Sequence, residues 1–147
     1  MENKNENLLF DLFICQRNFE KSLKNIVKKF GTSKNILEII FMTYLYKNPG
    51  ITQYDLWKKF KVEKSHINKI IKKLELENLL ELRVTVHGSL SKKNIYLTEK
   101  GKEISNFTLK NMSYLKKNIL KKHPLVDFNN FVSNVNLLSK FPQEDVM

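Results

Sequence analysis

Apolar residues recur at three- and four-residue steps along residues 8–30, a spacing that keeps one face of a helix apolar. This predicts a long first helix, which Gly31 is expected to end. A second apolar face predicts another helix, capped by Thr32 or Ser33 and stopped by the Asn-Pro-Gly of residues 48–50. The two faces consist of Leu9, Leu12, Phe13, Phe19, Leu23, Ile26 and Phe30, and then of Ile36, Ile40, Phe41, Tyr44 and Leu45.

Two short helices are predicted next, between residues 52 and 77. Thr52 and Asp55 have the spacing of a capping box, and the helix that they open carries Leu56 and Phe60. The second short helix has the clearest period in the chain, because its apolar residues follow the i, i+3, i+4, i+7 pattern. These residues are Ile67, Ile70, Ile71 and Leu74.

The apolar period changes to two after residue 79, which predicts a β-hairpin. Residues 87–93 are expected to form its polar turn, and residues 94–97 a short returning strand. In the first strand, apolar side chains alternate with polar ones, as in a strand with one buried face. The apolar members are Leu80, Leu82, Val84 and Val86.

Two further helices are predicted after the hairpin. Thr98 can cap one that runs to about Lys122, and the last one starts at Asp127. The predicted fold class is therefore mainly α with a small β-hairpin: a winged helix-turn-helix with helices on both sides of it. The apolar face of the last helix consists of Phe128, Phe131, Val132, Val135 and Leu138.

Length and charge narrow the possible partners. A chain of 147 residues can bury its own core, so residues 1–147 are predicted to form a single domain. The net charge of +11 favours polyanions, nucleic acid before an anionic membrane. The chain has no alanine and many lysines and asparagines, a bias that an AT-rich coding sequence also produces. The placement of the lysines is therefore more informative than their number.

The sequence disfavours membrane, metal and enzyme functions. Its longest apolar run, residues 39–42, is too short to span a bilayer, and the polar N-terminus has no export signal, so a cytoplasmic protein is expected. Cys15, the only cysteine, is expected to be a buried structural thiol. His66, His87 and His123 lack metal-ligand spacing. No phosphate loop or nucleophile–base arrangement occurs, so neither a cofactor nor an enzymatic activity is expected.

The polar side of the helix predicted from residue 64 carries the candidate DNA-binding residues. Serine and asparagine near its N-terminal end can hydrogen-bond base edges or phosphates, and lysines neutralise phosphates. A lysine-rich face on an isolated helix is usually only solvated, but a helix-turn-helix followed by a hairpin favours DNA. Ser65, Lys69 and Lys72 lie opposite the apolar face, Asn68 and Lys73 flank them, and Lys64 and His66 lie at the margins.

The hairpin offers three more cations. Lys92 and Lys93 are expected on its polar tip, where they can reach an adjacent groove or its phosphates. Arg83 lies on the polar side of the first strand, where it either anchors the DNA backbone or simply faces solvent.

At these residues the chain resembles the multiple-antibiotic-resistance regulator (MarR) family of winged helix-turn-helix transcriptional regulators, over about residues 34–104. The most specific segment is YLTEKGKE at residues 96–103, which contains a Leu-Thr-x-x-Gly element. The segments ITQYDL at residues 51–56, ENLL at residues 77–80, and residues 67–74 are similar as well.

The resemblance implies a homodimer held together by helical regions at residues 8–30 and 105–141. It also implies a reading helix in the major groove of double-stranded DNA, wings on the flanking DNA and, in many members, a small phenolic effector between the two regions. Some relatives sense organic peroxides through a cysteine in the first helix, but the apolar neighbours of Cys15 disfavour that role.

Two features depart from the family pattern. Where the wing usually carries Asp-x-Arg, residues 89–91 are Ser-Leu-Ser, and the cations are displaced to Lys92 and Lys93. Trp57 occupies a position that is usually small, and Lys61 one that is often glycine. The first short helix can therefore cross the reading helix differently.

Two functions follow as alternatives. The first is sequence-specific DNA binding by a homodimeric transcriptional regulator, a repressor at an inverted-repeat operator that a small effector can release. The second is a winged-helix interaction module whose basic surface meets a protein or an anionic membrane. Binding that neutralises several DNA phosphates weakens steeply with salt, and differently for operator and random DNA, which separates the two.

Overall fold

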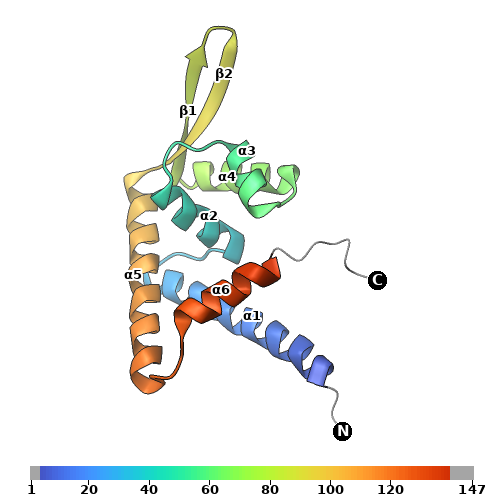
Figure 1. Cartoon of the computed structure of the whole chain (residues 1–147). Helices are drawn as coiled ribbons and strands as arrows, with labels where there is room; N and C mark the ends of the chain where they lie inside the picture. The colour runs from blue at the N-terminus through green and yellow to red at the C-terminus, as the bar shows by residue number, and fades with distance from the viewer. Residues whose placement is uncertain (1–3, 140–147) are drawn as a thin grey trace. The chain divides into compact units, whose positions relative to one another are not determined.

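The computed structural model describes residues 4–139, and the side chains of residues 8–137. The chain divides into two compact units, Met1–Asn111 and Met112–Met147, and one helix runs from the first into the second. That residues 1–147 form one domain stays a prediction, and residues 140 and 141 of the predicted region 105–141 lie outside the described residues. The elements are α1 (Lys4–Lys29), α2 (Ile36–Lys47), α3 (Gln53–Phe60), α4 (Lys64–Leu76), β1 (Leu80–His87), β2 (Leu90–Leu97), α5 (Glu99–Lys122) and α6 (Phe128–Ser139) (Figure 1).

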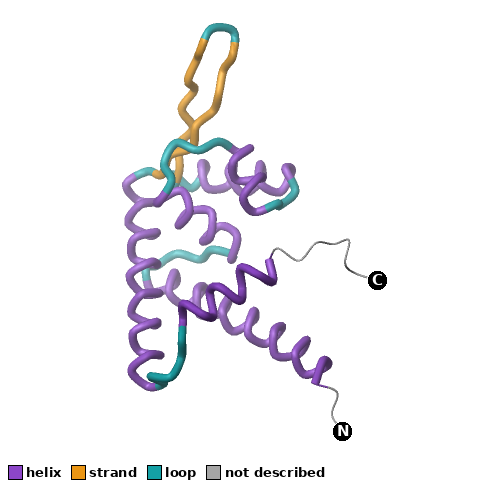
Figure 2. The backbone as a smooth tube through the Cα atoms, viewed as in Figure 1, coloured by secondary structure: helices purple, strands orange, loops and turns teal. Residues whose placement is uncertain are grey.

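The predicted fold class is confirmed. Figure 2 shows helices throughout the described chain and one antiparallel hairpin, in the order that the periodicity predicts. Gly31, at φ +90°, follows α1 as expected. The predicted cap of α5 is also present, because Thr98 Oγ1 accepts a hydrogen bond from the backbone N–H of Gly101 at 3.2 Å. Asp127 starts α6 in the same way, by accepting from the N–H of Asn130 at 3.0 Å.

The cap of α2 is Asn35, so the prediction of Thr32 or Ser33 is wrong. The Asn35 side chain accepts a hydrogen bond from the backbone N–H of Glu38 at 2.9 Å, and the Asn35 N–H donates to Glu38 Oε2 at 3.1 Å. This capping box satisfies two backbone donors at once. Neither Thr32 nor Ser33 has a glutamate three positions later, so neither can form such a reciprocal pair.

The core of the first unit lies where α2, α3, α4 and the base of the hairpin meet. The predicted capping box opens α3, since the Asp55 N–H donates to Thr52 Oγ1 at 3.2 Å and the Thr52 N–H donates to Asp55 Oδ2 at 2.8 Å. The four apolar residues predicted for α4 are all buried, none more than 4% exposed. They pack among Phe41, Met42, Leu45, Leu56, Leu79, Leu80 and Ile95, which are also buried.

The hairpin has a longer second strand and a shorter turn than predicted. Strand β2 pairs with β1 along its whole length, and only residues 88 and 89 form the turn. Gly88, at φ +63°, is the first of these two residues, where a type II′ turn requires glycine. The predicted turn over residues 87–93 is therefore wrong, and Lys92 and Lys93 lie within β2 rather than on a tip.

Only the base of the hairpin is packed. Ile95 and Leu97 are buried there, whereas Val84 and Val86 are 58% and 66% exposed. The outer half of the hairpin projects beyond the helices of its own unit (Figure 1). The prediction of a strand with one buried face is thus wrong for this half, because no helix of the unit covers it.

The Leu-Thr-x-x-Gly element joins the end of α4 to the start of α5. The Thr98 hydroxyl donates to the carbonyl oxygen of Asn78 at 2.8 Å, and the Thr98 N–H donates to that of Leu79 at 3.1 Å. A Cβ atom on Gly101 would lie 2.1 Å from the same Leu79 oxygen. Only glycine therefore allows α5 to begin this close to residue 79.

Helix α1 has two different halves. Leu23, Ile26 and Val27 are buried, as the predicted face requires, but the apolar residues of the N-terminal half are between 47% and 66% exposed. Cys15 is exposed as well, so the prediction of a buried thiol is wrong. Its half of α1 is apolar on several sides, and one packed side cannot bury it. The exposed apolar residues are Leu8, Leu9, Phe10, Leu12, Phe13, Ile14 and Phe19.

In the second unit, α6 also keeps its apolar residues in contact with solvent. Phe131, Val132 and Val135, all predicted on one face, are between 45% and 56% exposed. The side chains of Leu138 and Phe141 lie outside the described residues. None of the helices in the described part of the chain is long and apolar enough to cross a membrane.

Candidate nucleic-acid interface

Helix α4 presents a polar arc opposite its buried side. This arc consists of Ser65, Asn68, Lys69 and Lys72, and all four are exposed. The buried side packs against α2, α3 and β1, so the orientation of the arc is fixed by the core of the unit. Glu75 and Leu76 follow at the C-terminal end of the helix and are exposed too. The cationic part of α4 therefore belongs to its first turns.

Two of the predicted DNA-binding lysines of α4 have partners within the chain. Lys73 Nζ lies 2.5 Å from Oε1 of Glu38, which is 1% exposed, and this hydrogen bond raises the pKa of Lys73 above its ordinary value. Lys64 Nζ lies 4.5 Å from the centroid of the Trp57 ring. His66 is exposed beside the arc. Lys73 thus ties α4 to α2, and Lys64 leans toward α3.

Lys92 and Lys93 lie near the start of α3. Together with residues 52–55 they line one surface hollow, and the positive charge of Lys92 contributes to the lowered pKa of Asp55. The largest cause of that lowering is the hydrogen bond from the backbone N–H of Thr52. The structure therefore brings the wing cations next to the helix-turn-helix, which the sequence pattern did not reveal.

The base of the wing is fastened to the segment before α3. The N–H of Ile95 donates to the carbonyl oxygen of Ile51 at 2.8 Å, and the side chain of Asn94 donates to that of Gly50 at 2.7 Å. Arg83 also acts at this base. Its Nε donates to Glu81 Oε1 at 2.8 Å, and its guanidinium lies 4.4 Å from the Tyr96 ring centroid.

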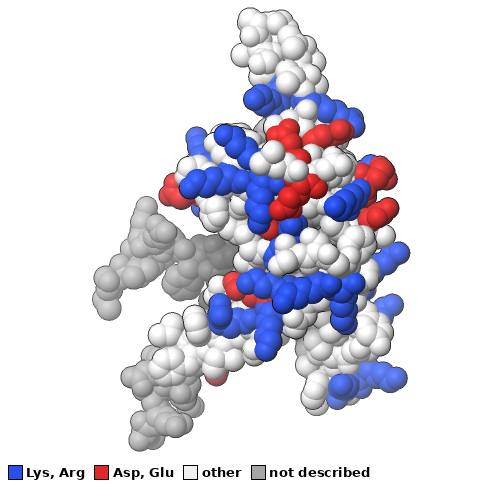
Figure 3. Space-filling view, turned by 180° about the vertical axis from the view of Figure 1, so that it is seen from behind, with Lys and Arg blue, Asp and Glu red and all other residues white. Residues whose placement is uncertain are grey.

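Charge is spread over this part of the molecule rather than gathered in one patch. Figure 3 shows lysines and arginines with acidic residues among them, and a hairpin tip that carries neither. The tip, residues 86–91, is Val-His-Gly-Ser-Leu-Ser. Phosphate contacts are therefore expected from Lys92 and Lys93 and not from the tip. In the described part of the chain no group of histidine, cysteine and acidic residues could hold a metal ion.

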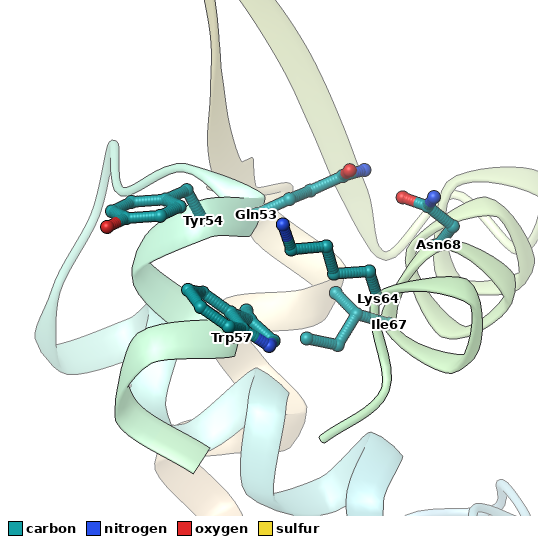
Figure 4. A pocket seen from close by; sticks show the side chains of 6 residues that line it. All are labelled: Gln53, Tyr54, Trp57, Lys64, Ile67 and Asn68. Carbon is teal, nitrogen blue, oxygen red and sulfur yellow. The ribbon is translucent and has the colours of Figure 1, made fainter. Parts of the chain in front are cut away.

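A pocket between α3 and α4 contains residues that were not among the sequence-based candidates. Gln53, Tyr54 and Trp57 line it from α3, and Asn68 shares it with the polar arc (Figure 4). Trp57 stood out in the sequence only as a large residue at a position that is usually small. The first-turn position of Gln53 and Tyr54, just after a cap, is the signal that pointed to this surface.

Comparison with known proteins identifies the fold. Residues 40–101 match the family described as F-93, winged-helix domain. No curated protein sequence gives a match. The transcriptional regulator SlyA has a TM-score of 0.74 at 19% identity, covering 90% of this chain and 92% of that chain.

Two further solved structures are similar to this chain. A putative MarR family transcriptional regulator from Listeria monocytogenes complexed with 26mer DNA has a TM-score of 0.74 at 20% identity, covering 90% of this chain and 86% of its own. MarR from Staphylococcus aureus in complex with salicylate and kanamycin has a TM-score of 0.71 at 16% identity, covering 95% and 90%. The predicted winged helix-turn-helix of the MarR type is thereby confirmed as a fold.

Proposed function

We propose that this chain, which has the winged helix-turn-helix fold of MarR-family regulators, is a sequence-specific DNA-binding regulator of transcription. It works as a homodimeric repressor at an inverted-repeat operator. The observation that carries the proposal is the exposed polar arc of α4, held in place by four buried residues on the opposite side. Ser65 and Asn68 supply hydrogen-bonding groups for base edges, and Lys69 and Lys72 supply ammonium groups for phosphates.

The other candidate residues take different parts in this proposal. Lys92 and Lys93 contact phosphates beside the groove that α4 enters, because they lie next to the start of α3. Lys73 and Arg83 are already bonded to Glu38 and Glu81, so we assign them the task of holding α4 and the wing in position. His66 and Lys64 lie at the margins of the arc.

The proposed homodimer rests on the exposed apolar residues of α1 and α6. Side chains such as Phe10, Phe13 and Phe131 are more than half exposed in the single chain. Large apolar surfaces of this kind mark protein interfaces. A second copy offers the same surface by symmetry, and a two-fold dimer can place two reading helices in half-sites about one helical turn, roughly 34 Å, apart.

Selection of bound sequences from a pool of random DNA duplexes tests the proposal. We expect recovery of an inverted repeat, with affinity that falls linearly in log–log form as salt rises, by about 0.9 per phosphate neutralised. The control is a scrambled duplex of equal length, which should bind more weakly at every salt concentration. Equal binding to selected and scrambled duplexes would contradict sequence-specific recognition.

A further inference from the structure

A cavity opens between α3 and α4 beside the polar arc (Figure 4). It has a volume of about 210 Å³. For comparison, an apolar cavity of about 150 Å³ in another protein holds a benzene molecule. The space is therefore sufficient for one substituted aromatic ring. Its walls are formed by Gln53, Tyr54, Trp57, Lys64, Ile67 and Asn68.

The walls combine aromatic, cationic and amide groups. The rings of Tyr54 and Trp57 lie 5.5 Å apart at 42° and form a continuous aromatic wall, and buried Ile67 closes the apolar side. Gln53 and Asn68 place their amides at the rim, one from each helix (Figure 4). An aromatic ring prefers to stack against such a wall in an offset or tilted arrangement.

Lys64 supplies the only charge in this wall. Its ammonium lies over the Trp57 ring, and among the described residues it forms no ion pair with a carboxylate. A ligand carboxylate can therefore bind it without displacing an internal partner. Hydrogen bonds between charged groups are about twice as strong as those between neutral ones. The cavity thus favours an aromatic acid over a neutral aromatic compound.

We propose that this cavity binds a planar aromatic carboxylate, with the ring against Trp57 and the carboxylate on Lys64, and that the bound acid competes directly with DNA. The competition rests on the proposed function, because Asn68 and Lys64 belong both to the cavity and to the surface that faces DNA. Ligand and duplex then exclude each other at the reading helix itself. No movement between the two units is required.

The occupancy of the cavity can be followed without DNA, since Trp57 is the only tryptophan in the chain. Benzoate is the probe, benzamide is its neutral counterpart, and cyclohexanecarboxylate is the acid without an aromatic ring. We expect a saturable change in tryptophan fluorescence with benzoate at roughly millimolar concentration, the range for so small a ligand. Both counterparts should bind at least tenfold more weakly. A benzoate response that rises linearly, as for free N-acetyltryptophanamide, would overturn the proposal.

Matched lysine variants test the role of the ammonium group. Lys64→Met keeps an apolar stem of similar length and should weaken benzoate binding at least tenfold while leaving benzamide binding unchanged. Lys59→Met, on the same pair of helices but outside the cavity, should bind both probes as the parent does. Both lysines are exposed, and circular dichroism checks that the variants are folded. Benzoate binding by Lys64→Met equal to that of the parent would refute the assigned role.

Competition is measured with the parent protein and the selected duplex. Benzoate should raise the apparent Kd for DNA by the factor 1 + [benzoate]/Kd, with sodium chloride added to controls at equal ionic strength. Failure of the parent to bind any duplex without benzoate would contradict the proposed function and leave the fluorescence result standing. Benzoate that saturates the cavity but leaves DNA affinity unchanged would instead overturn the competition alone.

Discussion

The helix-turn-helix and the terminal helices use apolar residues in opposite ways. In α4 every residue of the apolar period is at most 4% exposed, whereas the apolar residues in the first half of α1 and on α6 are between 45% and 67% exposed. Apolar periodicity predicts that a face will be covered, but not by which chain. The reading surface is therefore held by packing within one chain, while the terminal helices await a partner.

The largest expected effect comes from matched leucine substitutions in the two regions. Leu74→Ala empties a buried position and should lower the free energy of unfolding by about 2–5 kcal/mol. Leu12→Ala makes the same chemical change at a residue that is 53% exposed and should change the stability of the monomer little. Denaturant unfolding at several protein concentrations checks both. Only the loss from Leu12→Ala should depend on concentration, because it acts through dimer contacts. Equal, concentration-independent losses would remove the contrast.

Asn68→Ala tests the reading surface on the stable side of this comparison. We expect a loss of about 1–3 kcal/mol in binding to the selected operator if the amide pairs with a base, and a much smaller loss on random DNA. Folding should be normal, because Asn68 is exposed. Fluorescence anisotropy with both duplexes measures the two affinities. Preserved operator preference in a folded dimer would show that another face of α4 meets the bases.

Lys73 and Lys72 are neighbours on α4 with different expected effects. Lys73→Met leaves the buried Glu38 carboxylate without its ammonium partner and should cost about 1–3 kcal/mol of stability, a range kept low because Lys73 itself is half exposed. Lys72→Met should leave stability unchanged, weaken all duplexes and reduce the salt slope by about one unit. Thermal unfolding and salt titrations separate the two. The reverse assignment would show that Lys73, not Lys72, faces DNA.

The contribution of the Lys73 ion pair has a defined pH range. The pKa of Lys73 in the folded protein lies above its ordinary value of 10.5. A raised pKa stabilises the fold at pH values below about 10.5, and this stabilisation is lost as the pH rises through the folded-state value. The difference in stability between the parent and Lys73→Met should thus be constant near neutral pH and shrink only in strong alkali.

The double variant Lys92→Ala, Lys93→Ala tests the wing. Affinity for operator and for random DNA should fall by similar factors, on the order of tenfold, because lysines at this place contact phosphates rather than bases. Stability should be unchanged, since both side chains are exposed. Parallel salt titrations of variant and parent give the number of phosphates that the variant no longer neutralises. Identical slopes at equal affinity would remove the wing from the interface.

The smallest expected effect concerns the capping box of α3. Hydrogen bonds from Thr52 lower the pKa of Asp55 below its ordinary value of 3.8. The stabilisation is therefore present above pH 3.8 and is lost as the pH falls through the lower folded-state value. Asp55→Asn should remove this acid dependence and cost less than about 1 kcal/mol at neutral pH. Acid unfolding of Asp55→Asn that matches the parent would show that other carboxylates control the transition.

Local patterns predicted a large part of the fold and of the site. The capping box of Thr52, the end of α1 at Gly31 and the buried side of α4 depend on residues within one or two turns of each other. Spacing along the sequence is enough to reveal them. The exposed positions of Ser65, Asn68 and Lys69 follow from the same period, because the polar side of a helix is set once its buried side is known.

Other features depend on what lies next to a residue in space. The cap at Asn35 was missed because Thr32 and Ser33 are equally good cap residues in isolation, and only Glu38 decides between them. The wing was misjudged because alternation predicts a face but not the length over which a neighbour covers it. Val84 and Val86 continue the pattern beyond the helices that bury Leu80.

The sequence by itself thus determined the order of the elements, the reading helix and its polar side, because these are properties of nearest neighbours along the chain. The tertiary structure alone decided that Lys73 bonds Glu38, that Lys92 and Lys93 lie beside α3, and that Trp57 and Lys64 share a cavity with Asn68. The physical reason is that a cation has no preferred partner along the sequence. Which acid, ring or phosphate it meets depends on how segments far apart in the chain are packed together.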